Sequence, residues 1–373
     1  MEMTILPRVV FLTDIPTPYM IAVLRALARR VDLTVVFCAR RGSRGADWAF
    51  RPELGFRHRV LGGLRLGRGS PDAADRYPTP RILGALIAQR PAAVISGAFS
   101  FPTLSAAVYG IAKRVPFVIH SDGTSHSERT FGRGQRVARR FLVPRAAACV
   151  GNSAPAVERF IELGAPPERV FSAPHATDIA PFQAVAARRD GARTPLTVLH
   201  VGRLIPRKGV DRLLRAAATA AATVPLRVVL VGSGPEEAAL RILARDLRLE
   251  VEFRGFIDQP GLPEVYAEAD VFAFPTLEDP FGIVLLEAAA SGLPLVASPF
   301  GGATPDLVRD GVNGFVADPD DTAAWARALV ALARDPGLRR RLGDAAQAAV
   351  RDRTPEHAAD GYAQAVNAVL TRR

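Results

Sequence analysis

The sequence predicts an α/β protein with two doubly wound domains, in which helices cover both faces of a parallel sheet. At 373 residues the chain is longer than one ordinary domain requires. Short continuous apolar runs alternate with segments of helical length, a pattern typical of buried parallel strands. The alternation stops in the polar segment 183–195 and then begins again, which indicates a second domain of the same kind.

The first half of the chain, 1–182, is predicted to form the N-terminal domain. The expected strands and helices there are strand 8–12, helix 19–30, strand 33–38, helix 80–89, strand 93–96, helix 103–114, strand 117–120, helix 154–163 and strand 169–172. A further strand is expected at 147–150. Between 40 and 80, Gly, Arg and Pro interrupt the pattern, so we expect loops or short strands. The basic segment 129–145 is expected to be a loop that leads into a helix.

The second half is predicted to form a C-terminal domain at 196–354, with 183–195 as the linker. The expected elements are strand 196–201, helix 209–222, strand 226–231, helix 235–247, strand 251–254, helix 262–267 and strands at 271–274 and 295–297. Open α/β sheets bind ligands at the carboxyl ends of their strands. We therefore expect an active site in the cleft between the halves.

Charge is distributed unevenly. Residues 1–182 contain 25 Arg and Lys against 13 Asp and Glu, whereas 183–373 contain 23 against 24. The basic excess of the first half favours an anionic membrane face or an acidic acceptor, and an ordinary solvated surface is the alternative. Because no groove-reading motif occurs, we expect no nucleic-acid partner.

The chain is expected to be cytoplasmic. Because its first half is basic, we also expect peripheral contact with the inner face of the plasma membrane. No apolar run approaches the roughly 18 residues that a membrane span needs. The first residues lack the pattern of a signal peptide. Cys38 and Cys149 have neither paired nor metal-ligand spacing, which favours a reduced compartment.

The stretch 276–291 predicts an anion site. Asp279 is a good N-cap and Pro280 suits a first helical position, so a helix should open near Phe281. The first N–H groups of a helix attract anions. Asp279 and Glu287 lie on either side of this entrance. A sugar nucleotide needs such an arrangement, because its diphosphate lies between a ribose and a hexose, whose hydroxyls carboxylates can bind. The simpler interpretations are an N-cap for Asp279 and a solvated acid for Glu278.

Arg203 and Lys208 follow the first strand of the second domain in a loop that contains Gly202, Pro206 and Gly209. Both side chains can converge on one anion, and each charge-assisted hydrogen bond contributes about 1.5–3 kcal/mol. The pair therefore predicts a diphosphate clamp, and a solvated basic loop is the alternative.

Two further loops follow strands of the second domain. The glycine loop 231–235 opens a helix and, through Gly234, allows close approach to a ligand. Phe256, after the strand at 251–254, is placed to form the wall of a nucleobase pocket, and a plain transition from core to loop is the alternative. A GxGxxG fingerprint is absent, which argues against an NAD enzyme.

Five segments in this order resemble the retaining glycosyltransferase family 4 of the GT-B fold. They are GRLIPRKGVDRLL at 202–214, VGSGPE at 231–236, FRGFI at 253–257, the stretch 275–294 and FGGATPDLVRDGVNGFVADP at 300–319. The resemblance is strong over 195–335. In the first half, TDIPTPYMIAVLRAL at 13–27 and PFVIHSDGT at 116–124 resemble acceptor domains of bacterial cell-surface polysaccharide members.

The resemblance implies a donor site in the second domain. Arg203 and Lys208 would hold the diphosphate and stabilise the charge of the departing nucleotide. Asp279 would bind hydroxyls of the donor sugar and Glu287 those of the ribose. The other donor-binding residues that it implies are Gly234, Phe256, Glu278, Phe281, Gly282 and Ile283.

The resemblance also implies roles in the first domain. His120, at a strand end, would face the donor sugar and join Arg203, Lys208 and Asp279 in the catalytic set. His126 is the alternative, and a structural role for His120 is the simpler interpretation. Pro18 and Asp122 would lie, with His126, on the acceptor side. No metal or cofactor is implied, because the nucleotide sugar is a co-substrate. The last segment, 355–373, would be a helix that returns to the first domain.

The chain departs from the family pattern at three places. Asp279 stands where Glu is usual and is one methylene shorter, with Glu278 beside it. Pro16-Thr17-Pro18 replaces a glycine pair in the first loop, and Asp306 also stands in place of Glu. These departures concern the sugar-binding carboxylate and the acceptor loop.

The resulting prediction is a retaining transferase that moves a sugar from a nucleotide donor to a hydroxyl. The acceptor would be a lipid-linked or cell-surface glycan intermediate or a small molecule. Two alternatives stay open: another GT-B nucleotide-sugar enzyme such as an epimerase, and a non-catalytic partner that binds sugar nucleotides or scaffolds a pathway.

Overall fold

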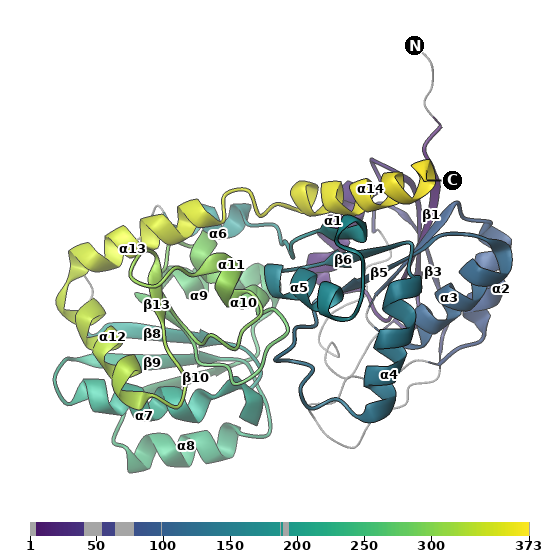
Figure 1. Ribbon diagram of the computed structural model, residues 1–373. Coiled ribbons are helices and arrows are strands. Elements are labelled where there is room, and N and C mark those ends of the chain that lie inside the picture. The colour runs from purple at the N-terminus through teal and green to yellow at the C-terminus, as the bar shows by residue number, and fades with distance from the viewer. Residues whose placement is uncertain are drawn as a thin grey trace. The chain divides into compact units, whose positions relative to one another are not determined.

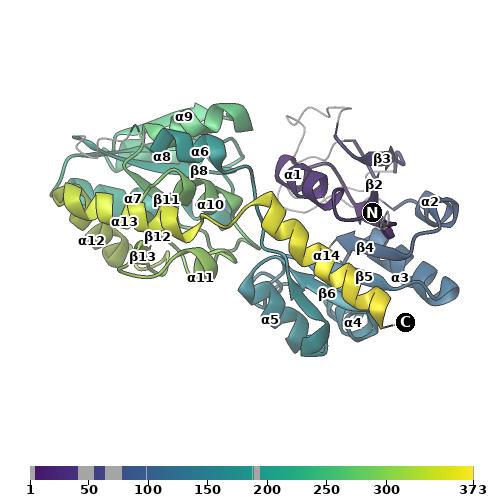
Figure 2. The ribbon, with the colours of Figure 1, turned by 90° about the horizontal axis from the view of Figure 1, so that it is seen from above.

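The computed structural model describes residues 5–40, 54–63, 78–97, 99–186, 188 and 194–372 (Figures 1 and 2). The chain divides into two compact units. Unit 1 comprises Met1–Asp178 and Arg353–Arg373, and unit 2 comprises Ile179–Asp352. Among the described residues, no helix has the length and apolar character needed to cross a bilayer.

Unit 1 is built on a seven-stranded sheet with the strand order β3-β2-β1-β4-β5-β6-β7. Every strand pair is parallel; Phe11, for example, lies opposite Val35 and Ile95. The strands are β1 (Arg8–Thr13), β2 (Asp32–Phe37), β3 (Arg57–Val60), β4 (Ala93–Gly97), β5 (Phe117–Ser121), β6 (Ala148–Gly151) and β7 (Val170–Ser172). The strand order reverses between β1 and β4, and such a switch point is where open sheets bind ligands.

Helices cover both faces of this sheet. The helices are α1 (Pro18–Leu27), α2 (Arg81–Gln89), α3 (Phe101–Lys113), α4 (Arg133–Leu142), α5 (Ala154–Glu162) and α14 (Pro355–Thr371). One apolar core joins α1 and α14 to the sheet, and a second joins α2, α3, the end of α4, and α5 to the opposite face. Helix α14, yellow in Figures 1 and 2, therefore brings the end of the chain back onto unit 1.

Unit 2 repeats the design with a six-stranded parallel sheet, in the order β10-β9-β8-β11-β12-β13. The strands are β8 (Leu196–Val201), β9 (Leu226–Val231), β10 (Val251–Gly255), β11 (Val271–Phe274), β12 (Leu295–Ala297) and β13 (Gly314–Val316). All six residues of β8 are buried, as expected for a central strand with helices on both faces.

The helices of unit 2 also form two layers. They are α6 (Ala180–Ala186), α7 (Val210–Ala221), α8 (Glu237–Asp246), α9 (Leu262–Ala267), α10 (Ile283–Ala290), α11 (Thr304–Leu307), α12 (Thr322–Arg334) and α13 (Pro336–Ala349). One core contains side chains of α6, α9, α10 and α11, and the other contains side chains of α7, α8 and α12. The predicted α/β class with two parallel, doubly covered sheets is confirmed.

Some predicted boundaries differ from the structure. The proposed linker 183–195 begins inside α6, whose Phe182 and Val185 are buried in unit 2, and the unit boundary falls after Asp178 rather than after 182. The sequence did not predict this helix because its seven residues, APFQAVA, are too few to show a helical period. Residues 187 and 189–193, also in the proposed linker, lie outside the described residues.

Candidate donor and transfer sites

Two strand-end loops of unit 2 are in contact through their backbones. The N–H of Gly202 donates to the carbonyl of Val231 at 2.9 Å, and that of Leu204 to the carbonyl of Ser233 at 3.0 Å. A Cβ atom at Gly234 would overlap the carbonyl oxygen of Leu204. Gly234, predicted to bind the donor, is thus required for the contact between the loops that present Arg203 and the start of α8.

Lys208 and Asp279 are brought together from motifs 71 residues apart. Lys208 ends a short 3-10 turn, Pro206–Lys208, and Gly209 follows with a φ of 63°, a left-handed conformation that suits glycine. The Lys208 ammonium forms an ion pair with Oδ2 of Asp279, and the side chains are only 13% and 11% exposed. Two residues that the sequence assigned to diphosphate and sugar therefore form one buried charged pair.

The helix after Asp279 starts later than predicted. Asp279 is not an N-cap, because α10 begins at Ile283 with Gly282 as its N-cap, and Pro280 is not in the helix. Gly282 has a φ of 93°, and a Cβ there would overlap the ring of Phe274. Oδ1 of Asp279 instead accepts a hydrogen bond from the Phe281 N–H at 3.3 Å. Position 282 therefore requires glycine, and Asp279 lies in the turn before α10 rather than at its N-cap.

Arg207, which the sequence analysis did not single out, holds the loop before Asp279. Its carbonyl oxygen accepts hydrogen bonds from the Leu277 N–H at 2.8 Å and the Thr276 hydroxyl at 3.1 Å. Its guanidinium donates to the carbonyl of Glu278 at 3.0 Å. The lysine loop and the acidic loop are thus joined by hydrogen bonds of the Arg207 backbone and side chain, close to the Lys208–Asp279 pair.

Glu287 lies one turn into α10 and is almost fully buried. Its Oε2 accepts a hydrogen bond from the Tyr266 hydroxyl at 3.0 Å. Burial raises the pKa of Glu287 to about 7, and the hydrogen bond from Tyr266 opposes that rise only partly. The predicted ribose-binding carboxyl therefore changes charge near neutral pH.

The other predicted donor residues have different degrees of exposure. Phe256 follows β10, and its side chain is 46% exposed, so its ring face is free to stack on a planar group. Arg203 and Glu278 are half-buried, as is Ile283, whereas Phe281 is buried.

His200 is a buried polar residue of unit 2 that the sequence analysis missed. One ring nitrogen lies 3.1 Å from the carbonyl of Ala273, and Nε2 is buried without a hydrogen-bond partner among the described residues. Burial lowers the pKa of His200 to about 4, and the Lys208 ammonium contributes in the same direction. A histidine within an otherwise apolar strand was the signal in the sequence.

His120 lies at the end of β5 in unit 1, in a buried aromatic setting. Nδ1 is 3.2 Å from the Tyr362 hydroxyl and 3.5 Å from Oδ1 of Asn152, and the ring centroid is 5.0 Å from that of Phe11. Burial lowers the pKa of His120 to about 4, against a smaller opposite effect of Asn152. The imidazole is therefore neutral at pH 7.

The partners of His120 hold one nitrogen of its ring. Asn152 donates from Nδ2 to the carbonyl of Ala173 at 2.7 Å and to the Tyr362 hydroxyl at 3.1 Å, so its Oδ1 faces His120 as an acceptor. Nδ1 can donate to this Oδ1, which leaves a lone pair on Nε2, or accept from the Tyr362 hydroxyl, which leaves the proton on Nε2. Nε2 has no partner among the described residues, and a Cβ at Gly97 would stand 2.5 Å from it. Nδ1 of His120 is thus held by protein groups, whereas Nε2 keeps one hydrogen-bonding capacity.

The predicted acceptor-side residues lie in different surroundings. Asp122 is 3.8 Å from Nε2 of His175, whose ring stacks edge-on against Tyr19 at 5.6 Å. Pro18 precedes Tyr19 and occupies the first turn of α1. His126 instead contacts the guanidinium of Arg129 on the surface. Asp122 therefore lies beside His175, which packs against Tyr19 of α1, whereas His126 lies in the turn that follows.

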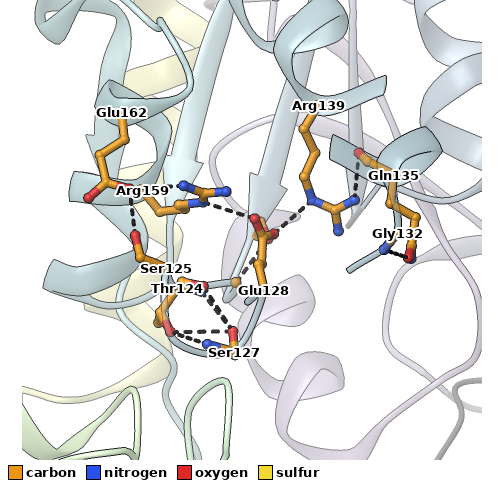
Figure 3. A network of polar contacts seen from close by, with 11 residues as sticks. Thr124, Ser125, Ser127, Glu128, Gly132, Gln135, Arg139, Arg159 and Glu162 are labelled. Carbon is orange, nitrogen blue, oxygen red and sulfur yellow. Dashed lines mark hydrogen bonds and ion pairs between the residues drawn. The ribbon is translucent and has the colours of Figure 1, made fainter. Parts of the chain in front are cut away.

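Glu128 anchors the loop that follows β5 (Figure 3). Its Oε1 accepts from Nε of Arg139 in α4 at 2.8 Å, and its Oε2 from Nε of Arg159 in α5 at 2.9 Å. Arg159 also contacts Glu162, which accepts a hydrogen bond from the Ser125 hydroxyl. The loop that carries Asp122 is thus tied to two helices, an arrangement not evident in the sequence.

Glu128→Gln should destabilise unit 1, because the substitution leaves two arginines facing a neutral amide in a buried site. Breaking a buried ion pair costs about 3–5 kcal/mol. For a unit of this size, a loss near 3 kcal/mol corresponds to roughly 6–12 °C in the unfolding midpoint, measured by calorimetry. Glu162→Gln is the matched control: its side chain is half-exposed, so its loss should cost less than about 1 kcal/mol. Equal midpoints for both variants would show that Glu128 does not anchor the loop.

Sequence comparison identifies the family. A profile described as "Glycosyl transferase 4-like domain" matches residues 16–175, and one described as "Glycosyl transferases group 1" matches 195–335. The chain belongs to the group 1 glycosyltransferases, family 4. The two matches together span most of both units, so the family resemblance suggested by the motifs is confirmed.

Curated relatives include enzymes that act on different acceptors. A D-inositol 3-phosphate glycosyltransferase of Nocardia farcinica is 34% identical over 253 residues, which are 63% of this chain and 56% of the relative. A GDP-mannose-dependent monoacylated α-(1-6)-phosphatidylinositol monomannoside mannosyltransferase of Corynebacterium glutamicum is 36% identical over 165 residues, 42% of each chain. The chain spans about half the length of the curated relatives it matches.

Solved structures establish the GT-B fold. HepE of Anabaena, crystallised with UDP-glucose, has a TM-score of 0.78 at 22% identity, covering 97% of this chain and 99% of that one. The apo form of WaaB, a lipopolysaccharide outer core galactosyltransferase, has a TM-score of 0.73 at 15% identity, covering 96% and 99%.

Proposed function

We propose that this family 4 chain transfers a sugar from a nucleoside diphosphate donor to a hydroxyl, with retention of the anomeric configuration and without a metal or cofactor. The observation that carries the proposal is the buried Lys208–Asp279 pair at the strand ends of unit 2. A buried ion pair is often no more stabilising than apolar side chains of similar volume, so this pair has a poor rationale as a structural device. As a ligand site, it offers an ammonium and a carboxylate side by side.

The donor would exchange this internal pairing for its own contacts. A diphosphate presents anionic oxygens to Lys208 and Arg203, and sugar hydroxyls donate hydrogen bonds to Asp279. The first N–H groups of α10 add a positive potential on the same side as Asp279. Lys208 and Arg203 would stabilise the negative charge that develops on the leaving nucleoside diphosphate, which is the main demand of the transition state.

Phe256 and Glu287 would hold the nucleoside. The exposed ring of Phe256 suits stacking on a base, and the Glu287 carboxylate suits the two ribose hydroxyls. In unit 1, Nε2 of His120 would accept a hydrogen bond from a hydroxyl of the donor sugar, while Asp122 and Pro18 would border the acceptor.

The acceptor is proposed to be a hydroxyl on a lipid-linked or cell-surface glycan intermediate or on a small molecule. The names of the relatives support this range, since one includes an inositol phosphate and another a phosphatidylinositol mannoside. The proposal places the reaction in the cytoplasm, with peripheral contact to the inner face of the plasma membrane.

The proposal is tested by nucleoside diphosphate release from a panel that includes UDP-glucose and GDP-mannose, with inositol phosphate, phosphatidylinositol and glycolipid acceptors. Release that depends on one acceptor supports transfer. Binding of a donor without release for any acceptor would favour a non-catalytic sugar-nucleotide-binding partner, and conversion of the donor sugar without an acceptor would favour an epimerase.

Donor affinity should depend on pH through Glu287. With a pKa of about 7, the carboxyl is protonated below that pH and is then a poor acceptor for ribose hydroxyls. Affinity for the intact nucleotide sugar, which does not itself titrate in this range, should rise by roughly five- to tenfold from pH 6 to pH 8. Glu287→Gln should bind weakly at both pH values, and Glu278→Gln should keep the slope, as measured by calorimetry. A slope that survives in Glu287→Gln would assign the titration to another group.

A further inference from the structure

One face of unit 1 exposes an unusual row of apolar side chains. On α3, Phe101, Leu104, Val108 and Ile111 are 38%, 51%, 49% and 65% exposed. Their spacing places them on one side of the helix. The opposite side of α3 faces the core through Ala106, Ala107 and Tyr109. A helix that is apolar on its outer face as well as its inner one requires something to cover the outer face.

The neighbouring helices extend this face. Helices α2, α3 and α4 all join the same core on one side of the sheet, and α3 lies between α2 and α4 in both views (Figures 1 and 2). Ile87 of α2 and Val137 and Phe141 of α4 are 56%, 67% and 53% exposed. We call the outer side of α2, α3 and α4 the α2–α4 face.

The charge of the α2–α4 face has a single sign. None of the three helices contains Asp or Glu. Arg133, Arg136 and Arg140 are exposed on α4 beside its two apolar side chains, and Lys113 is exposed at the end of α3. In contrast, α8 of unit 2 carries acids and arginines, including the ion pair of Arg241 with Glu237, and exposes one large apolar side chain, Ile242.

We infer that the α2–α4 face docks onto an anionic lipid bilayer, with the apolar side chains in the interface and the cations against lipid phosphates. Amphipathic helices with arginines beside apolar residues bind such surfaces through apolar burial and charge attraction together. An exposed acid would be repelled by the lipid headgroups, and these helices have none. A protein partner would not need a face that lacks one sign of charge. This inference assigns a surface to the membrane contact of the proposed function, on which it rests, and does not depend on the proposed reaction.

The test is cosedimentation of the full chain with vesicles of phosphatidylcholine alone or mixed with phosphatidylglycerol. We expect binding to the mixed vesicles, weak binding to phosphatidylcholine, and release by high salt. Arg136→Glu/Arg140→Glu should lower the partition coefficient at least tenfold, because one cation near an anionic surface contributes about fivefold. Leu104→Gln/Ile111→Gln should also lower it at least tenfold, because the variant no longer buries two large apolar side chains in the interface. Ile242→Gln is the matched control, since Ile242 is 52% exposed, and it should stay within twofold of wild type.

Circular dichroism and unfolding midpoints would establish that the variants are folded, as expected for exposed substitutions. The inference is overturned if wild type binds neither vesicle, or if Ile242→Gln loses as much binding as Leu104→Gln/Ile111→Gln. It is also overturned if wild type self-associates in size-exclusion chromatography and Leu104→Gln/Ile111→Gln abolishes that association without changing vesicle binding. None of these results requires a donor or an acceptor, so failure here leaves glycosyl transfer untouched.

Discussion

Lys208→Ala should lower kcat/KM by about 10²–10³-fold, the largest loss expected of any single substitution in this chain. In other enzymes, removing one preorganised hydrogen-bond donor that faces the charge developing in the transition state lowers the rate by a similar factor. The Lys208 ammonium would be a hydrogen-bond donor that also carries a positive charge. Loss of Lys208 removes the cation that would neutralise the departing nucleoside diphosphate. Steady-state kinetics with the donor and acceptor found by the release assay provide the measurement.

The same substitution also leaves the Asp279 carboxylate buried without its cation, so folding must be measured beside activity. We expect Lys208→Ala to lose a few kcal/mol of stability, because unpaired buried charges are costly. Lys208→Ala/Asp279→Asn should recover much of that stability while staying as inactive as Lys208→Ala. If the double variant recovered activity together with stability, Lys208 would serve the fold and not the donor.

Lys113 provides a matched control, since it is the only other lysine in the sequence. It is exposed at the end of α3 in unit 1. With soluble substrates, Lys113→Ala should keep kcat/KM within twofold of wild type. A similar loss in both variants would point to a general effect of positive charge on the encounter with an anionic donor.

His120→Ala should lower kcat by about 10²-fold while leaving the affinity of unit 2 for nucleoside diphosphate unchanged. Nε2 of the neutral imidazole is buried and has no partner among the described residues, and a substrate hydroxyl is the partner that we propose for it. Because the pKa of His120 is about 4, protonation of this residue should not reduce kcat between pH 8 and about pH 5.5. Unchanged kcat in His120→Ala would make the residue structural.

Tyr362→Phe separates the two roles of this cluster. It removes the hydroxyl 3.2 Å from Nδ1 but keeps the ring that packs on His120. We expect a fall in kcat of no more than about tenfold, since Asn152 still holds Nδ1. A loss in Tyr362→Phe as large as that in His120→Ala would mean that orientation of the ring accounts for the whole effect.

The two buried histidines should each contribute stability that acid removes. Burial lowers the pKa values of His120 and His200 to about 4, below the 6.5 of an exposed imidazole. Between these values each histidine binds more protons in the unfolded chain, so its contribution is fully present above pH 6.5 and is lost as the pH drops towards 4. The raised pKa of Glu287 acts in the opposite direction over part of this range, so the contribution is measured as a difference between variants. In denaturant titrations at pH 7.5 and 5, acidification should be less unfavourable to the stability of His200→Gln than to that of wild type.

Sequence pattern predicted the fold well because each parallel strand is a short apolar run and each domain repeats one plan. It predicted the start of α10 poorly, since Gly282 has a left-handed φ of 93° and packs against the ring of Phe274, a tertiary contact that the local sequence does not show. The hidden helix α6 has a similar explanation, because Phe182 anchors it to a core made elsewhere in the chain.

Partners in the candidate sites could not be predicted from spacing. Lys208 pairs with a residue 71 positions away, and His120 contacts Tyr362 across 242 positions. The sequence around Glu128 and its two arginines matches no motif. Arg139 of α4 and Arg159 of α5 meet Glu128 only in the folded chain. Residue types at strand ends indicated which groups were available, but the pairs that set their charge and orientation came from topology.

Proton NMR of the product formed from an α-linked nucleotide sugar shows whether sugar transfer proceeds with retention at the Lys208–Asp279 site. We expect a new glycoside whose anomeric proton has the α configuration, formed by wild type and essentially absent with Lys208→Ala/Asp279→Asn. A β-linked product, or an α-linked product formed as fast by the double variant, would contradict this expectation.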